Sequence, residues 1–203
     1  LSVSLFNSSL IFSESFNYNL EDNNPDSLKL SASWKGITAS YIMSYTKGAD
    51  FDEEQGWKLR ENKEFLPYSA SLTIAPTLPT FKTWFKRITF NPGINTNVVV
   101  DLIRPTNSYL LFSPSISFTI NEFLTFTFSS TSRNSVLYRY VQSALGHPGR
   151  IPGEQNFFVD LVNSFRFDNE NLRKGSGFKL KSLNFEITHN LHDWDFKMLF
   201  KME

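Results

Sequence analysis

Hydrophobic and polar residues alternate along most of the chain with a period of two. This spacing is typical of β-strands that present one face to an apolar environment and the other to a polar one. A two-residue turn at 35–36 places the apolar residues of both flanking strands on one face, which predicts a β-hairpin. The predicted partners are Trp34 with Ile37, Ala32 with Ala39, Leu30 with Tyr41, and Leu28 with Met43.

The same test predicts two more hairpins. A three-residue turn at 121–123 pairs Ile120 with Leu124, Phe118 with Phe126, and Ile116 with Phe128. A four-residue turn at 190–193 pairs His189 with Trp194, Ile187 with Phe196, Phe185 with Met198, and Leu183 with Phe200. Elsewhere the apolar residues keep one parity from Trp84 to Leu102 and from Leu66 to Ile74, which predicts two further strands.

In total the pattern predicts about ten strands. They are 1–6, 10–20, 28–34, 37–46, 66–76, 84–102, 109–120, 124–132, 178–189 and 194–202. Most connections are short, and the longer ones are 21–27, 47–65 and 133–177. We therefore expect an antiparallel meander with tight turns at one end and long loops at the other.

The length and polarity of these strands favour a membrane protein. Several reach ten or more residues, close to the roughly 9 to 11 that a tilted strand needs to cross a bilayer. Strands of soluble sandwiches usually have about five or six residues. Aromatic residues near the strand ends match an interfacial girdle: Trp34, Tyr45, Tyr68, Trp84, Tyr109 and Trp194. We predict an all-β fold, an antiparallel transmembrane β-barrel over 1–203.

On strands 28–34, 37–46 and 109–120, the face opposite the apolar one is nearly all small and uncharged. The candidate lumen-facing residues are Ser31, Ser33, Thr38, Ser40, Ser115 and Ser117. Small closed barrels fill their interior with larger side chains, so this face favours a wide lumen filled with water. Both ends of the chain also break off within the alternating pattern. We therefore expect an open segment of a larger barrel, whose first and last strands do not pair.

One segment of the loop 133–177 departs from the period of two. Its apolar residues have helical spacing behind Asn156, a favourable N-cap residue. This predicts one short amphipathic helix over 157–165, which either packs on the loop's own hydrophobic patch or lies over the barrel mouth as a gate. The candidate gate residues are Phe157, Phe158, Leu161 and Phe165.

Composition excludes several classes of function. The 203 residues contain 20 basic and 20 acidic side chains, so nothing attracts the chain to nucleic acid, and we expect no such partner. The absence of cysteine excludes disulfides, thiol nucleophiles and thiolate metal sites. No apolar run approaches the roughly 18 to 20 residues of a membrane-spanning helix.

Three clusters have the composition of chemical sites but not the spacing. His189, His192, Asp193 and Asp195 offer zinc ligands but cross a predicted turn, so we interpret them as part of that turn. The acidic run 50–54 lacks the glycine and ligand pattern of a calcium loop. The run 146–153 is rich in turn residues but lacks the strand–loop–helix context of a phosphate-binding loop. With no nucleophile-elbow motif either, we expect no metal site, no cofactor and no enzyme.

Two stretches near the C-terminus, GSGFKLKSLNF (175–185) and THNLHDWDF (188–196), resemble the C-terminal barrel region of LptD-like proteins. FSSTSRN (128–134) and NSFRF (163–167) are similar to the same group, so the resemblance covers roughly residues 80–203. LptD-like proteins are the outer-membrane translocons that assemble lipopolysaccharide. Their best-known members carry cysteines that join the barrel to a periplasmic domain, whereas this chain has none.

The resemblance implies an outer-membrane protein of a diderm bacterium, in contact with outer-membrane lipid. Its barrel would receive lipopolysaccharide or a related glycolipid from a periplasmic transport bridge and release it through an opening between strands. A plug lipoprotein would occupy the lumen. Two alternatives remain open at this point, a porin-like passive channel and a soluble β-rich binding module. A porin should line its constriction with charged residues, and the inward faces predicted here offer few.

Overall fold

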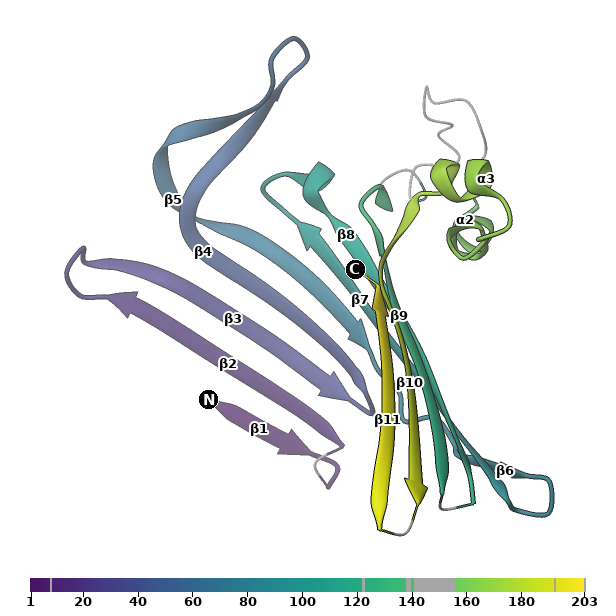
Figure 1. Cartoon of the computed structure of the whole chain (residues 1–203). Coiled ribbons are helices and arrows are strands. Elements are labelled where there is room, and N and C mark those ends of the chain that lie inside the picture. Colours follow the sequence, from purple (N-terminus) through teal and green to yellow (C-terminus); the bar gives the residue numbers. More distant parts are fainter. Residues whose placement is uncertain (8, 122, 138–139, 141–155, 192, 203) are drawn as a thin grey trace. The chain divides into compact units, whose positions relative to one another are not determined.

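Consecutive strands pair with one another along almost the whole chain in the computed structural model (Figure 1). The structure describes residues 1–203 apart from 8, 122, 138–139, 141–155, 192 and 203. This described part forms an 11-stranded sheet with the order β1-β2-β3-β4-β5-β7-β8-β9-β10-β11, and β6 pairs with β7. From β1 to β5, from β8 to β11, and between β6 and β7, neighbouring strands pair in antiparallel fashion, which fits the predicted all-β class.

Eleven strands, two α-helices and one 3-10 helix are described in this part of the chain. The strands are β1 (Ser2–Leu5), β2 (Leu10–Asn19), β3 (Asn24–Trp34), β4 (Ile37–Asp52), β5 (Gly56–Ile74), β6 (Phe81–Thr83), β7 (Ile88–Asp101), β8 (Tyr109–Ile120), β9 (Leu124–Asn134), β10 (Phe178–Leu191) and β11 (Trp194–Met202). The helices are η1 (Pro105–Asn107), α2 (Phe157–Ser164) and α3 (Glu170–Gly175).

Contacts divide the chain into two units, which we describe separately. The first contains 1–74, 97–109 and 135–138, and therefore strands β1 to β5 with the end of β7. The second contains 75–96, 110–134 and 139–203, and therefore β6, the start of β7, strands β8 to β11 and both α-helices.

The predicted β3–β4 and β8–β9 registers are confirmed. Trp34 pairs with Ile37, and every other predicted partner of that hairpin matches. Lys35 and Gly36 both have positive φ angles, 44° and 82°, which is the backbone of the tight turn that suits the twist of a hairpin. Ile120 likewise pairs with Leu124.

The predicted β10–β11 register is wrong by two residues. Leu191 pairs with Trp194, and His189 therefore pairs with Phe196. The strand continues further than expected because the backbone N–H of Asn190 donates to the carbonyl of Phe123, at 2.7 Å, and so ties the end of β10 to the neighbouring turn. A shift of two residues leaves every side chain on its predicted face.

The expected loop 47–65 is instead the far half of a long hairpin. Strands β4 and β5 remain paired as far as Asp52 and Gly56. The Asp52 carboxylate accepts hydrogen bonds from two turn N–H groups, and Gly56 has a φ of 75° that favours glycine. This ribbon reaches beyond β3 (Figure 1). The expected loop 21–27 is likewise wrong, because β2 ends at Asn19 and β3 begins at Asn24.

Two other strand predictions need correction. The expected strand 84–102 is a hairpin of β6 and β7, and Trp84 lies in its turn with a φ of 49°. In β5 the register shifts between Ser69 and Pro67, so Leu66 lies opposite Ser44 on the polar face and not with the apolar residues that follow it. A bulge suits this position because proline has no N–H to donate to the ladder.

Helix α2 occupies Phe157–Ser164, within the expected range 157–165. The Asn156 side chain caps it by accepting from the N–H groups of Phe158 and Val159. The sequence predicted one helix, but α3 follows as a second, capped by Asn169. No helix in the described residues combines the length and the apolar character needed to cross a membrane. The turn-rich run 146–153 lies outside the described residues.

Candidate functional site

In the first unit, one face of the sheet is lined by hydroxyl groups. A row of five serines crosses β1 to β5, each directly opposite the next: Ser2, Ser13, Ser31, Ser40 and Ser71. In the adjacent row the Ser33 and Thr38 hydroxyls lie 2.9 Å apart. Four candidate lumen residues, Ser31, Ser33, Thr38 and Ser40, therefore lie together on one polar face, which also carries Lys29.

In the second unit, hydroxyl pairs also join β8 to β9. Ser117 accepts from Thr127 at 3.4 Å, and Ser115 lies opposite Ser129. Gly93 on β7 faces Ser115 so closely that a side chain there would collide with the Ser115 hydroxyl. The candidates Ser115 and Ser117 thus lie on the polar face of this unit. Whether either polar face lines a lumen stays a prediction.

Charged residues enter this polar face at β10 and β11. Lys197 donates to Glu186 at 2.8 Å, and Thr188 donates to the same carboxylate at 3.3 Å. Lys201 lies on the same face, opposite Asn184. The sequence predicts few charged residues on the inward faces. Glu186, Lys197 and Lys201 are exceptions, and their parity in the sequence already places them on this face.

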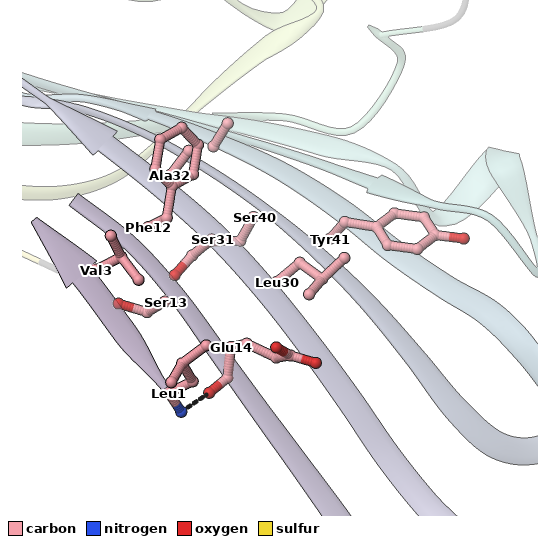
Figure 2. Close-up of a pocket in the computed structure, with 11 residues that line it drawn as sticks. Leu1, Val3, Phe12, Ser13, Glu14, Leu30, Ser31, Ala32, Ser40 and Tyr41 are labelled. Carbon is pink, nitrogen blue, oxygen red and sulfur yellow. Dashed lines mark hydrogen bonds between the residues drawn. The ribbon is translucent and has the colours of Figure 1, made fainter. Parts of the chain in front are cut away.

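The apolar face of the first unit contains a groove of about 480 Å³ (Figure 2). It is hollow in the middle because small Ala32 and Ala39 lie opposite one another between larger neighbours. Its apolar lining comes from β1 to β4 and from the residue before β1: Leu1, Val3, Phe12, Leu30, Ala32, Ala39 and Tyr41. Glu14 also lines it, and Ser13, Ser31 and Ser40 border it although their register places their side chains on the opposite face. A groove of this chemistry suits an acyl chain or another extended apolar group.

Glu14 is the exception among the apolar residues of this groove. It lies opposite Leu30 on the same face as Phe12. A carboxylate on an apolar face is costly in lipid and is therefore a candidate functional residue. Sequence reasoning missed Glu14. The available signal was an acidic residue at a position of the strand where the alternation calls for an apolar one.

A second groove, of about 1030 Å³, lies along the turns of the second unit. The β6–β7 hairpin contributes three cations to its lining, Lys82, Lys86 and Arg87. The β8–β9 turn is joined to this hairpin by a backbone hydrogen bond from Asn121 to Arg87, at 2.7 Å. Positive charge in an open groove suits an anionic group such as a phosphate. Sequence reasoning missed it because the long predicted strand concealed the turn.

Three of the four candidate gate residues, Phe157, Leu161 and Phe165, are half-buried where α2 packs on the sheet. The Phe157 ring lies 5.2 Å from that of Phe178 and 5.6 Å from that of Tyr140, measured between ring centres. The fourth, Phe158, is exposed. By register, Phe178 lies on the same face as Phe128 and the other apolar residues of β9 and β10. The gating role stays a prediction.

The clusters with candidate metal ligands have other partners. His189 lies edge-on to Phe123, and its expected neighbour His192 is outside the described residues. In the acidic run, Arg60 binds Asp50 with its guanidinium at 2.7 Å and lowers the pKa of that carboxyl. Hydrogen bonds from turn N–H groups lower the pKa of Asp52. Within the described part of the chain, no group of three potential ligands is placed to hold a metal ion.

Comparison of the chain with models of protein families, with curated proteins and with solved structures finds no match. The features of the fold that bear on function are the two contrasting faces, the apolar groove, and the basic turn edge formed by Lys82, Lys86 and Arg87.

Proposed function

We propose that this sheet belongs to a β-barrel in the outer membrane of a diderm bacterium, and that the barrel assembles lipopolysaccharide or a related amphiphile. The observation that carries the proposal is the pairing of an exposed apolar face with a hydroxyl-lined one, on strands long enough to cross a bilayer. Strands β2 to β5 have 10 to 19 residues, and β7 to β11 have 9 to 14.

The apolar face is continuous and exposed to the surroundings. One row of the first unit reads Leu5, Leu10, Trp34, Ile37 and Ile74 across five strands. In the second unit Phe196, Met198 and Phe200 are each about half exposed. An exposed apolar surface of this extent is unfavourable in water but is stable against lipid acyl chains.

The polar face supports transport of an amphiphile. Serine and threonine hydroxyls offer hydrogen bonds to sugars without the charge of a packed interior network. The resemblance to LptD-like proteins supports a plug lipoprotein in the lumen and a periplasmic bridge that delivers the glycolipid. The function is transport, and no residue is assigned a catalytic role.

A porin-like passive channel is the second candidate. Glu186, Lys197 and Lys201 form a charged group on the polar face of β10 and β11. Charged side chains of this kind select ions in pores. If this function is correct, channels in planar bilayers should lose ion selectivity in the Lys197→Ala variant, and no lipopolysaccharide should cross-link to a photoreactive residue at Ser40.

Thiol labelling tests whether the sheet is in a membrane. The chain has no cysteine, so a single substitution introduces a unique thiol. After folding into lipid vesicles, a membrane-impermeant thiol reagent should label Ser31→Cys and Ser40→Cys but not Leu30→Cys or Ala39→Cys. Glu54→Cys, at the exposed end of the β4–β5 ribbon, is the positive control. Equal labelling of both sets would contradict the membrane proposal.

A further inference from the structure

Helix α2 turns apolar residues toward the surroundings, while its inward side is mixed and includes Asp160 and Ser164 beside Phe157. Asp160 faces inward, where its carboxylate accepts from the Tyr140 hydroxyl at 2.7 Å and from the Gly177 N–H at 3.2 Å. One turn later, Ser164 is fully buried. The outward residues Phe158, Val159 and Val162 are 73%, 54% and 64% exposed. A surface helix in water keeps its exposed side polar and its apolar stripe toward the core.

Beneath this helix, strand β9 is polar where the rest of its face is apolar. Along β9, the face that carries Phe126 and Phe128 continues as Ser130, Ser132 and Asn134. These last three residues are at most 2% exposed. Asn134 donates to the Tyr140 hydroxyl at 2.8 Å, which links the strand to Asp160 on α2. Between the sheet and α2, these polar groups lie beside the aromatic contact of Phe157 with Phe178, and the exposed apolar residues of α2 lie outside them.

The orientation of α2 is set by specific packing. The Ser176 hydroxyl donates to the backbone carbonyl of Asp160 at 2.6 Å. A side chain at Gly177 would overlap the Tyr140 hydroxyl and would crowd both Asn134 and Asp160. Because Gly177, the half-buried carboxylate of Asp160 and the aromatic contacts of Phe157 all favour one arrangement, Phe158, Val159 and Val162 are held outward.

We propose that α2 is an interfacial anchor whose Phe158, Val159 and Val162 insert into a lipid bilayer. The inference rests on the proposed membrane location of the sheet. Its apolar residues extend the apolar face of β9 and β10, and helices of this kind lie about 5–10 Å into the boundary between acyl chains and headgroups. Residues 165–179 carry four basic and two acidic side chains, so their net charge of +2 is attracted to lipid phosphates.

Lipid-attached quenchers test this directly. Val162→Cys, labelled with bimane, would be placed in phosphatidylcholine–phosphatidylglycerol vesicles with and without brominated acyl chains. We expect brominated lipid to reduce its fluorescence about twofold, since the label lies among the acyl chains. Val162 is largely exposed, so the substitution should not disturb folding. Asn171→Cys on exposed α3 is the matched control and should be quenched little.

A label at Ala70→Cys, on the apolar face of β5, separates failure of the two proposals. Quenching at Ala70 without quenching at Val162 would overturn the anchor and leave the membrane sheet standing. An absence of quenching at both would overturn both proposals. The label at Val162 could instead become protected from solvent as the protein concentration rises, with no effect of brominated lipid. That result would show that a second copy of the chain covers α2, and it would also overturn the anchor.

Discussion

The apolar face of β3 to β5 and the helix-covered end of β9 and β10 have different surroundings. The first is uncovered and carries residues such as Leu30, Ala39 and Tyr41. The second lies under α2 and Tyr140 and carries Ser132 and Asn134 at corresponding positions of the strand pattern. Under the proposed membrane location, the first face contacts lipid, whereas the second contacts the polar groups of Tyr140 and α2.

The largest effect should come from placing a charge on the uncovered face. Ala70 lies opposite Tyr41 on the apolar side of β5, and its neighbour Ser71 lies opposite Ser40 on the polar side. Ala70→Arg should lower the free energy of unfolding by about 2 to 4 kcal/mol if the site is near the bilayer midplane, because hydrocarbon does not solvate the guanidinium. Unfolding by urea in lipid vesicles measures this difference.

Ser71→Arg is the matched control and should change the unfolding free energy far less, because its side chain reaches water. Equal losses in the two variants would remove the distinction between the faces. They would favour a soluble β-rich module.

A smaller effect should follow from disturbing the covered face. Gly177→Ala places a methyl group against the Tyr140 hydroxyl and should destabilise the protein by about 1–3 kcal/mol through overpacking. Gly175→Ala, two residues earlier, meets nothing within 4 Å and should leave stability unchanged or slightly higher. Urea unfolding of both variants tests this. Similar stability in the two would show that the contacts beneath α2 are dispensable.

The smallest effect should be that of acid on the stability of the β4–β5 ribbon, where both faces are solvated. The pKa values of Asp50 and Asp52 are lowered in the folded ribbon, by Arg60 and by turn N–H groups respectively. A carboxyl whose pKa is lower in the folded ribbon than in the unfolded chain stabilises the folded ribbon at pH values above its unfolded pKa of about 3.9. This stabilisation is lost as the pH falls through the folded pKa. Amide exchange at residues 47–60 should therefore quicken below about pH 4, beyond its intrinsic pH dependence.

The Asp50→Asn variant isolates this contribution. It should show faster exchange than the parent protein at neutral pH and a weaker response to acid, because the carboxylate bound to Arg60 is missing. An identical pH response in the two proteins would show that the ion pair does not hold the ribbon.

Sequence reasoning succeeded where one face is apolar and the turn is short. The alternation around Lys35 and Gly36 determines a register, because a slip of one residue would exchange the two faces. It failed by two residues at β10 and β11, since a slip of two leaves the faces unchanged and the alternation does not distinguish the two registers. The backbone bond from Asn190 to Phe123, at the end of β10, depends on a neighbouring turn and gives no signal in the local sequence.

Other features had no signal of this kind. The β4–β5 ribbon has charged residues on both sides, so its strands lack the alternation that would distinguish them from a loop. The groove containing Glu14 and the basic turn edge depend on pairing between strands. The candidate residues Ser31, Ser33, Thr38 and Ser40 did emerge from the sequence as a group, because parity alone places them together.

The backbone bonds between neighbouring turns have a mechanical consequence. Asn121 is tied to Arg87, and Asn190 to Phe123, so the β6–β7, β8–β9 and β10–β11 hairpins are joined at their tips as well as along their lengths. A pulling force on any one of these tips is then shared with the next hairpin. Separation of strands in this unit would have to begin at the opposite end, near α2, and spread toward the turns.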